Sequence, residues 1–133
     1  MRRINFKFKM ILSICLILVM STMYISARSV GSYDITMKRF GGVSYTDSLY
    51  KENQSRAVNN NTYIGGGYSM GCAIYRGETR ISEIRTIYMG DRVYLNYHAP
   101  SDAEHSRVRL GAWSKITTYV KVQTQGTWSP DEY

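Results

Sequence analysis

The residues best suited to chemistry gather in one short segment of the chain. His98 and His105 are the only histidines, and Pro100, Asp102 and Glu104 lie between them. Imidazoles and carboxylates could hold zinc or another divalent cation, or act as acid and base, if the loop folds both rings inward. Because the spacing matches no established zinc motif, we expect a solvated loop. A metal site at His98 and His105 is the alternative.

Other catalytic arrangements leave no recognisable trace. The chain has no G-x-S-x-G elbow for a nucleophilic serine. The acidic pairs Asp47/Glu52 and Asp102/Glu104 lie in polar stretches that would not raise the pKa of one carboxyl group. The sequence therefore predicts no catalytic residue and no cofactor. It favours a non-enzymatic protein, with a small hydrolase or metal-binding protein using the His98–His105 loop as the alternative.

Arginines alternate with tyrosines in the second half of the chain, where we expect a sheet. Such a face could bind an anionic polymer or surface. Alternatively, the arginines pair across strands with Glu78, Glu83 and Asp91 on a solvated face. The candidate surface-binding residues are Arg85, Arg107, Arg109, Tyr94 and Trp128.

The first 27 residues indicate export. Four basic residues between Arg2 and Lys9 precede an apolar run from Met10 to about Ile25, and Ser26-Ala27 offers small residues for cleavage. We expect a secretory signal peptide over residues 1–27 and a secreted protein that meets the membrane only through this segment. An uncleaved anchor is the alternative, although the run is short for a bilayer span.

Residues 28–133 then form a single secreted domain. Four of the 17 basic residues precede residue 28 and all 10 acidic residues follow it, which leaves a net charge of +3. At that modest charge, and outside the cell, we expect no nucleic-acid partner. A cell-surface or protein partner is compatible with the composition, and the oligomeric state stays open.

Cysteine content limits how this domain is held together. Cys15 lies in the signal segment, so Cys72 alone remains and no intramolecular disulfide can form. Cys72 alternates with Tyr68, Met70 and Ile74, which predicts a buried, unreactive thiol on an apolar strand face. A reactive thiol or an intermolecular disulfide is the alternative.

The central structural prediction is a β-hairpin over residues 81–97. Two alternating runs flank Gly90-Asp91, a pair typical of a two-residue hairpin turn. In that register Tyr88 pairs with Val93 and Ile84 pairs with Tyr97. One face would then be apolar, comprising Ile84, Thr86, Tyr88, Val93, Leu95 and Tyr97.

Further strands are expected on both sides of the hairpin. Turn residues recur every 8 to 12 residues or so, which is typical of a sandwich or small barrel. We therefore predict an all-β fold, a small antiparallel β-sandwich or a partly open barrel, with a polar, weakly helical stretch at 47–54. The expected strands are 33–37, 43–46, 55–62, 68–75, 106–113 and 116–125, with Trp128 lying over one end of the core.

A motif in residues 126–131 resembles sequences of known proteins. Gly126-Thr127-Trp128-Ser129-Pro130-Asp131, with Val58-Asn59-Asn60 upstream, resembles a group of small exported proteins of Gram-positive bacteria, largely of unknown function. More distantly, the layout is similar to bacteriocins of the lactococcin 972 type. The resemblance implies export and an all-β fold, and it transfers no catalytic residue.

Three classes of function follow from these observations. The first is a non-enzymatic binding or surface-interaction module of unknown ligand. The second is a bacteriocin-like antagonist of neighbouring cell envelopes, which a growth-inhibition assay with residues 28–133 would distinguish from the first. The third is the enzyme or metal protein of the His98–His105 loop.

Overall fold

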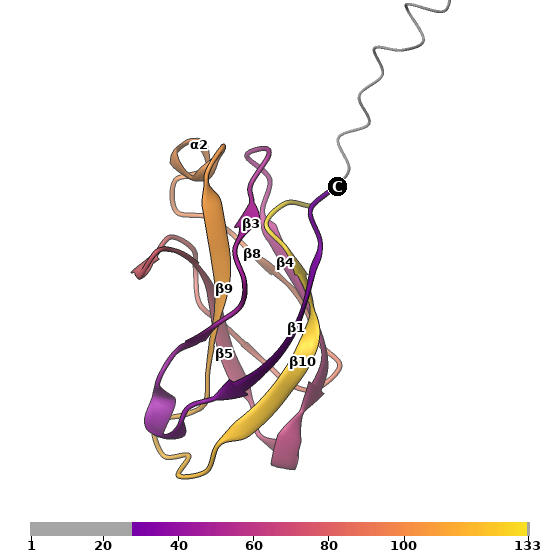
Figure 1. Ribbon diagram of the computed structural model, residues 1–133, viewed down its shortest axis with the longest axis vertical. Helices are drawn as coiled ribbons and strands as arrows, with labels where there is room; N and C mark the ends of the chain where they lie inside the picture. Colours follow the sequence, from indigo (N-terminus) through magenta and orange to yellow (C-terminus); the bar gives the residue numbers. More distant parts are fainter. Residues whose placement is uncertain (1–27, 133) are drawn as a thin grey trace, which may run out of the picture.

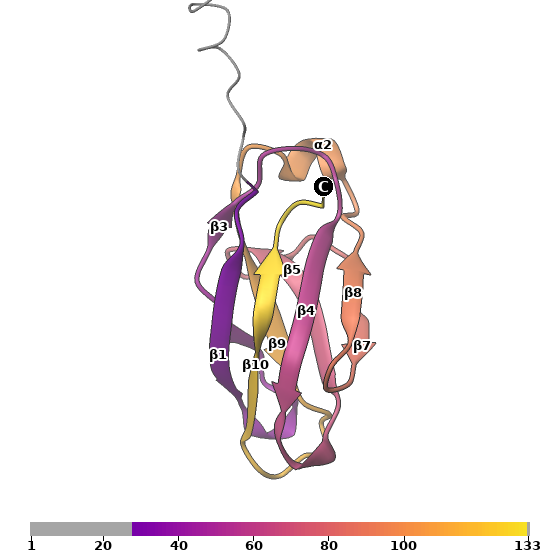
Figure 2. The same cartoon turned by 90° about the vertical axis from the view of Figure 1, so that its right-hand side faces the viewer.

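The computed structural model describes residues 28–132, which fold as a sandwich of two antiparallel sheets (Figure 1). The predicted signal segment, residues 1–27, lies outside the described residues. The first sheet contains, in spatial order, β1 (Gly31–Met37), β10 (Val122–Ser129), β4 (Ala57–Ile64) and β8 (Arg92–Leu95). Figure 2 shows these four strands side by side, with β9 and β5 behind them.

The second sheet is centred on the pair β9 (Arg107–Trp113) and β5 (Met70–Arg76). Two short strands pair with the free side of β9, namely β2 (Ser44–Tyr45) and β3 (Leu49–Tyr50). Two others pair with the free side of β5, namely β6 (Thr79–Arg80) and β7 (Arg85–Ile87). The sheets do not close on each other. The all-β sandwich prediction is confirmed, and the partly open barrel is not the form adopted.

The predicted 81–97 hairpin is wrong in its register and over most of its length: the two arms pair at an isolated antiparallel bridge, in which Ser82 and not Ile84 lies opposite Tyr97. A turn does form, because the Asp91 N–H donates to the Tyr88 carbonyl at 3.0 Å and Gly90 takes a φ of +90°. However, β7 then pairs with β5 in the second sheet, whereas β8 pairs with β4 in the first. The segment therefore bridges the two layers.

This crossing changes which side chains of the segment are buried. On β8 the prediction was right about Leu95, and Tyr97 just beyond it is buried too. On the other arm Ile87 fills the core, whereas Ile84 and Tyr88 are half exposed or more. Each arm still buries one face, but on the first arm it is the face opposite to the predicted one: Ile87 is buried, whereas Ile84, Thr86 and Tyr88 are exposed.

Two other predicted elements differ from the structure. Residues 47–54 contain β3 rather than a helical turn. The last strand begins only at Val122, because Lys115–Thr118 forms a turn in which the Thr118 N–H donates to the Lys115 carbonyl at 2.9 Å. A short helix, α2 (Pro100–Ala103), occupies the loop after β8. Within residues 28–132, no helix is long and apolar enough to cross a membrane.

The core lies between the sheets and includes a polar network. Alternation places Met70, Cys72 and Ile74 of β5 inside, as predicted. On β4, the Asn59 side chain accepts a hydrogen bond from the Tyr33 hydroxyl at 3.0 Å, and its Nδ2 contacts the Cys72 sulfur at 3.6 Å. Buried polar side chains need such partners, so Asn59 packs as an interior residue of β4, which continues to Ile64.

The Cys72 thiol is free and buried, as the sequence predicted. Burial raises its pKa from 9.0 to about 11. We expect no reaction of the folded protein with a thiol reagent at pH 8, and complete reaction in denaturant.

A pH prediction follows from the same shift. Between pH 9 and about 11 the unfolded thiol ionises while the folded thiol keeps its proton, so the free energy of unfolding should fall as pH rises. Urea unfolding of the wild type and of Cys72→Ala across this range measures the effect. An equally steep slope in Cys72→Ala would contradict it.

Candidate functional site

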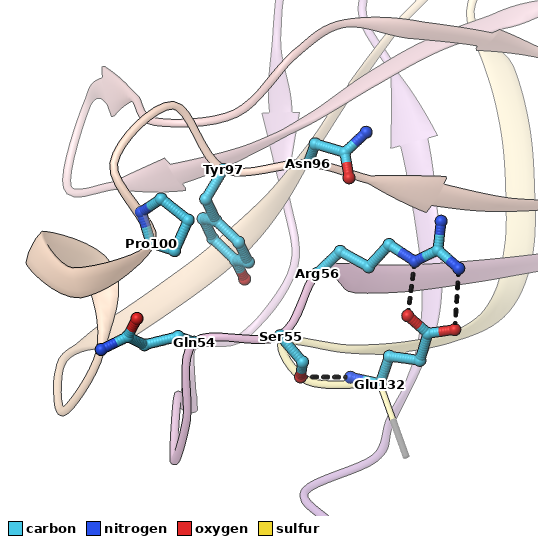
Figure 3. Close-up of a pocket in the computed structure, with 7 residues that line it drawn as sticks. All are labelled: Gln54, Ser55, Arg56, Asn96, Tyr97, Pro100 and Glu132. Carbon is cyan, nitrogen blue, oxygen red and sulfur yellow. Dashed lines mark hydrogen bonds and ion pairs between the residues drawn. The ribbon is translucent and has the colours of Figure 1, made fainter.

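A pocket of about 320 Å³ opens at the end of the sandwich that carries α2 (Figure 3). Three separate parts of the chain form its wall: the segment before β4, the segment after β8, and the segment after β10. Such loops at the end of a rigid sandwich are common places for binding sites. We call it the end pocket, and its lining residues are Gln54, Ser55, Arg56, Asn96, Tyr97, Pro100 and Glu132.

An ion pair forms one side of the end pocket. The Arg56 guanidinium donates from Nε and from Nη2 to the two carboxylate oxygens of Glu132, the second at 3.0 Å. The guanidinium also lies 3.9 Å from the centre of the Tyr94 ring. Both charged side chains remain partly exposed, at 43% and 28%. The pair is therefore accessible to solvent and held in a defined orientation.

Further positive charge surrounds this carboxylate. The hydrogen bond from Arg56 lowers the pKa of Glu132, and the charges of Arg56, Arg92 and Arg28 lower it further. Arg92 lies 5.9 Å from the centre of the Tyr94 ring, so it shares that ring with Arg56. We call Arg28, Arg56 and Arg92 the arginine cluster.

A buried ion pair lies beneath the pocket. Lys51 and Asp131 are both 0% exposed, and Lys51 Nζ lies 2.7 Å from Asp131 Oδ1. The Lys51 amine is also 4.1 Å from the centre of the Tyr97 ring, and the Tyr97 hydroxyl donates to the Pro130 carbonyl at 2.8 Å. Desolvation of this site lowers the pKa of Lys51, which the hydrogen bond to Asp131 opposes.

The hydrogen bonds of this pair show that it is a structural ion pair, which joins two segments of the chain. Lys51 Nζ also donates to the carbonyls of Ser55, at 2.6 Å, and Pro130, at 3.1 Å. These two bonds and the one to Asp131 use all three N–H groups of an ammonium. Asp131 Oδ2 in turn accepts from the Glu52 N–H at 2.7 Å. The pair thus ties the segment before β4 to the segment after β10, and both are pocket walls.

The two histidines do not line the end pocket. The side chain of His98 is exposed, and that of His105 is 65% exposed with Nε2 3.2 Å from Glu104 Oε1. Across residues 28–132, no group of three His, Cys, Asp or Glu side chains is arranged to hold a metal. The segment still contributes to the pocket, through Tyr97 and Pro100.

We predict that replacing both histidines changes little. His105 has a φ of +56°, which asparagine tolerates better than alanine, so the variant is His98→Ala with His105→Asn. The free energy of unfolding should stay within about 0.5 kcal/mol of the wild type. In a competition titration zinc should bind no tighter than roughly micromolar. Tighter binding that the double variant loses would restore the metal site.

The candidate surface-binding residues are not brought together. Arg107 and Arg109 lie on the same face of β9, where Arg109 donates to the Gly77 carbonyl and stacks 3.6 Å from the centre of the Tyr45 ring. Arg85 lies opposite Cys72 in the β5–β7 ladder, which places it on the other face of that sheet, at its edge. Tyr94 belongs to the first sheet.

Trp128 requires a correction. It is 2% exposed within β10 and packs in the core, so it cannot form part of a binding surface. The proposed pairing of arginines with Glu78, Glu83 and Asp91 is also not what the structure shows. Among residues 28–132, the arginine ion pairs are instead Arg56–Glu132 and Arg76–Asp102.

Sequence reasoning did not identify Arg56, Glu132 or Gln54 as site residues. They come from segments about 76 positions apart, and no local pattern marks them. Only the pairing of β4 with β10 brings these segments to one end of the sandwich.

Comparisons with known proteins identify no family for this chain. No protein-family model matches the chain, and no curated protein matches it. Among solved structures, one described as the "Crystal structure of PirA" is similar over 79% of this chain and 98% of its own, at 16% identity and a TM-score of 0.47. The chain is thus defined by its fold and site, as an antiparallel β-sandwich with one described end pocket.

Proposed function

We propose that residues 28–133 form an exported, non-enzymatic binding module whose ligand site is the end pocket. The observation that carries the proposal is the pocket itself: a concavity of about 320 Å³ beside a solvent-accessible, oriented ion pair. Its volume is at the lower end of the range for small-molecule sites, so the ligand is small or is the end of a larger molecule.

The Lys51–Asp131 ion pair beneath the pocket favours a binding function, because it fixes the shape of the site. Preformed sites lose less conformational entropy when a ligand binds. Here Lys51 and Asp131 hold two of the three pocket walls in place, and the Ser55 hydroxyl accepts from the Glu132 N–H at 2.9 Å. The site is therefore organised before any ligand arrives.

The titratable groups near the pocket favour binding over catalysis. All three N–H groups of Lys51 donate to partners within the protein, the carbonyls of Ser55 and Pro130 and the Asp131 carboxylate. The Tyr97 hydroxyl is committed to the Pro130 carbonyl, and burial strongly raises its pKa, so it is a poor acid or base at neutral pH. Neither group is placed to exchange protons with a molecule in the pocket.

A thermal-shift screen of small molecules tests the proposal. A true ligand raises the midpoint of unfolding, because binding to the folded state stabilises it by RT ln(1 + L/Kd), where L is the free ligand concentration. Asn96→Trp should fill the pocket and abolish the shift. Thr86→Trp, on the exposed face of β7, should preserve it. Ligands that stabilise Asn96→Trp as strongly as the wild type would place the site elsewhere and overturn the proposal.

A further inference from the structure

The strongest further feature is that the end pocket already holds a carboxylate, that of Glu132. We propose that the ligand of this pocket carries a carboxylate group, and that Glu132 occupies its place until the ligand arrives. This inference rests on the proposed binding function and names the chemical class of the ligand. Its first support is the bidentate geometry of Arg56, which matches a planar carboxylate with two parallel hydrogen bonds.

The orientation of Arg56 is fixed independently of Glu132. The guanidinium stacks on the Tyr94 ring, and that ring is held on β8 within the first sheet. A guanidinium held in this way keeps its donors directed at the same place when the carboxylate changes. The site therefore does not depend on Glu132 to remain in shape.

The charge balance also favours an external anion. Three arginines act on the single carboxylate of Glu132, so the arginine cluster keeps a net positive charge. A carboxylate ligand of the end pocket would therefore meet an attractive potential.

Glu132 can leave without disturbing the fold. The segment after β10 is held by the preceding residue, Asp131, whose carboxylate forms the buried ion pair with Lys51. The Glu132 side chain is partly exposed, and exposed ion pairs contribute little net stability. A ligand that replaces it gains the Arg56 contact and adds contacts of its own with Tyr97 and Pro100.

Calorimetric titration with a matched pair of probes tests this inference. Hippurate carries a carboxylate and a flat ring for Tyr97 and Pro100, whereas hippuramide has the same shape without the charge. We expect hippurate to bind at least tenfold more tightly than hippuramide. Inorganic phosphate, as a third probe, should bind more weakly than hippurate, because it has no ring to pack on the pocket wall.

Variants identify the groups responsible. Arg56→Gln should weaken hippurate binding at least tenfold, and Arg56→Lys should not restore it, because the bidentate geometry is lost. Glu132→Gln should tighten binding several-fold, since the internal competitor loses its charge. Arg76→Gln removes an exposed ion pair of similar kind, with Asp102, and should leave the affinity unchanged. Circular dichroism checks that each variant is folded.

Each contrary result has a defined meaning. Equal binding of hippurate and hippuramide, lost in Asn96→Trp, would leave the pocket as a binding site and overturn the carboxylate inference. Equal binding of phosphate and hippurate would also overturn it, because any anion would then suffice. Hippurate binding that is unaffected in Arg56→Gln or weakened in Glu132→Gln would contradict the replacement of Glu132. If the thermal-shift screen finds pocket ligands but no carboxylate among them, only the carboxylate inference fails.

Discussion

Replacing Lys51 with methionine should lower the free energy of unfolding by about 3–5 kcal/mol, which is the usual cost of breaking a buried ion pair. The substitution leaves the Asp131 carboxylate at 0% exposure without its charged partner. It also removes one hydrogen-bond donor from each of the carbonyls of Ser55 and Pro130. Urea unfolding followed by circular dichroism measures the change, because the midpoint and slope together give the free energy.

Two comparisons separate a lost charge pair from a general defect at this end of the sandwich. In the double variant Lys51→Met with Asp131→Leu, no charge stays buried alone, so much of the stability should return. Arg76→Ala breaks the exposed pair with Asp102 and should cost about 1 kcal/mol or less. A Lys51→Met variant as stable as the wild type would show that the pair does not fasten the pocket walls.

Replacing Trp128 with alanine should be comparably damaging, by about 3–5 kcal/mol, the usual cost of deleting a large buried side chain. Trp128 is 2% exposed in β10, a central strand of the first sheet, and neighbouring strands cannot close the space it leaves. The same urea titration measures the loss.

Trp113 offers the matched control, because it is a partly exposed tryptophan at the end of β9. Trp113→Ala should cost clearly less than Trp128→Ala. If instead Trp128→Ala remained stable but lost ligand binding, the original placement of Trp128 on a binding surface would be correct and its assignment to the core wrong.

The sequence predicts the strands of this fold well where one face of a strand is buried, because apolar residues then recur at every second position. Met70, Cys72 and Ile74 alternate with residues of the opposite face of β5, and Val108 and Leu110 do the same on β9. These two strands pair at the centre of the second sheet, where the inward face of each is buried. The predicted strands over 68–75 and 106–113 are therefore confirmed.

The same pattern could not reveal which strands pair. Gly90-Asp91 does make a turn, yet the two arms leave it for different sheets. Turn chemistry fixes only a few residues, whereas the choice of partner depends on distant strands. For Ile87, the deciding neighbour is Met70, which lies opposite it in β5. The alternation of residues within one strand does not indicate which distant strand pairs with it.

The candidate site was predictable only in part, for the same reason. The histidine loop drew attention through residue type alone, and it reaches the end pocket through Tyr97 and Pro100 instead of His98 and His105. Arg56 and Glu132 are ordinary charged residues in their local context. They form a site because the start of β4 lies beside the end of β10. The spacing of residues within either segment does not indicate this contact.

The most direct test of the central claim, that the end pocket is the ligand site, is a map of amide chemical shifts in ¹⁵N–¹H spectra during titration with hippurate. Our account predicts the largest changes at residues 54–56, 96–99 and 132. Changes centred on the outer face of β9, around Arg107 and Arg109, or no changes at the end pocket at saturating hippurate, would contradict it.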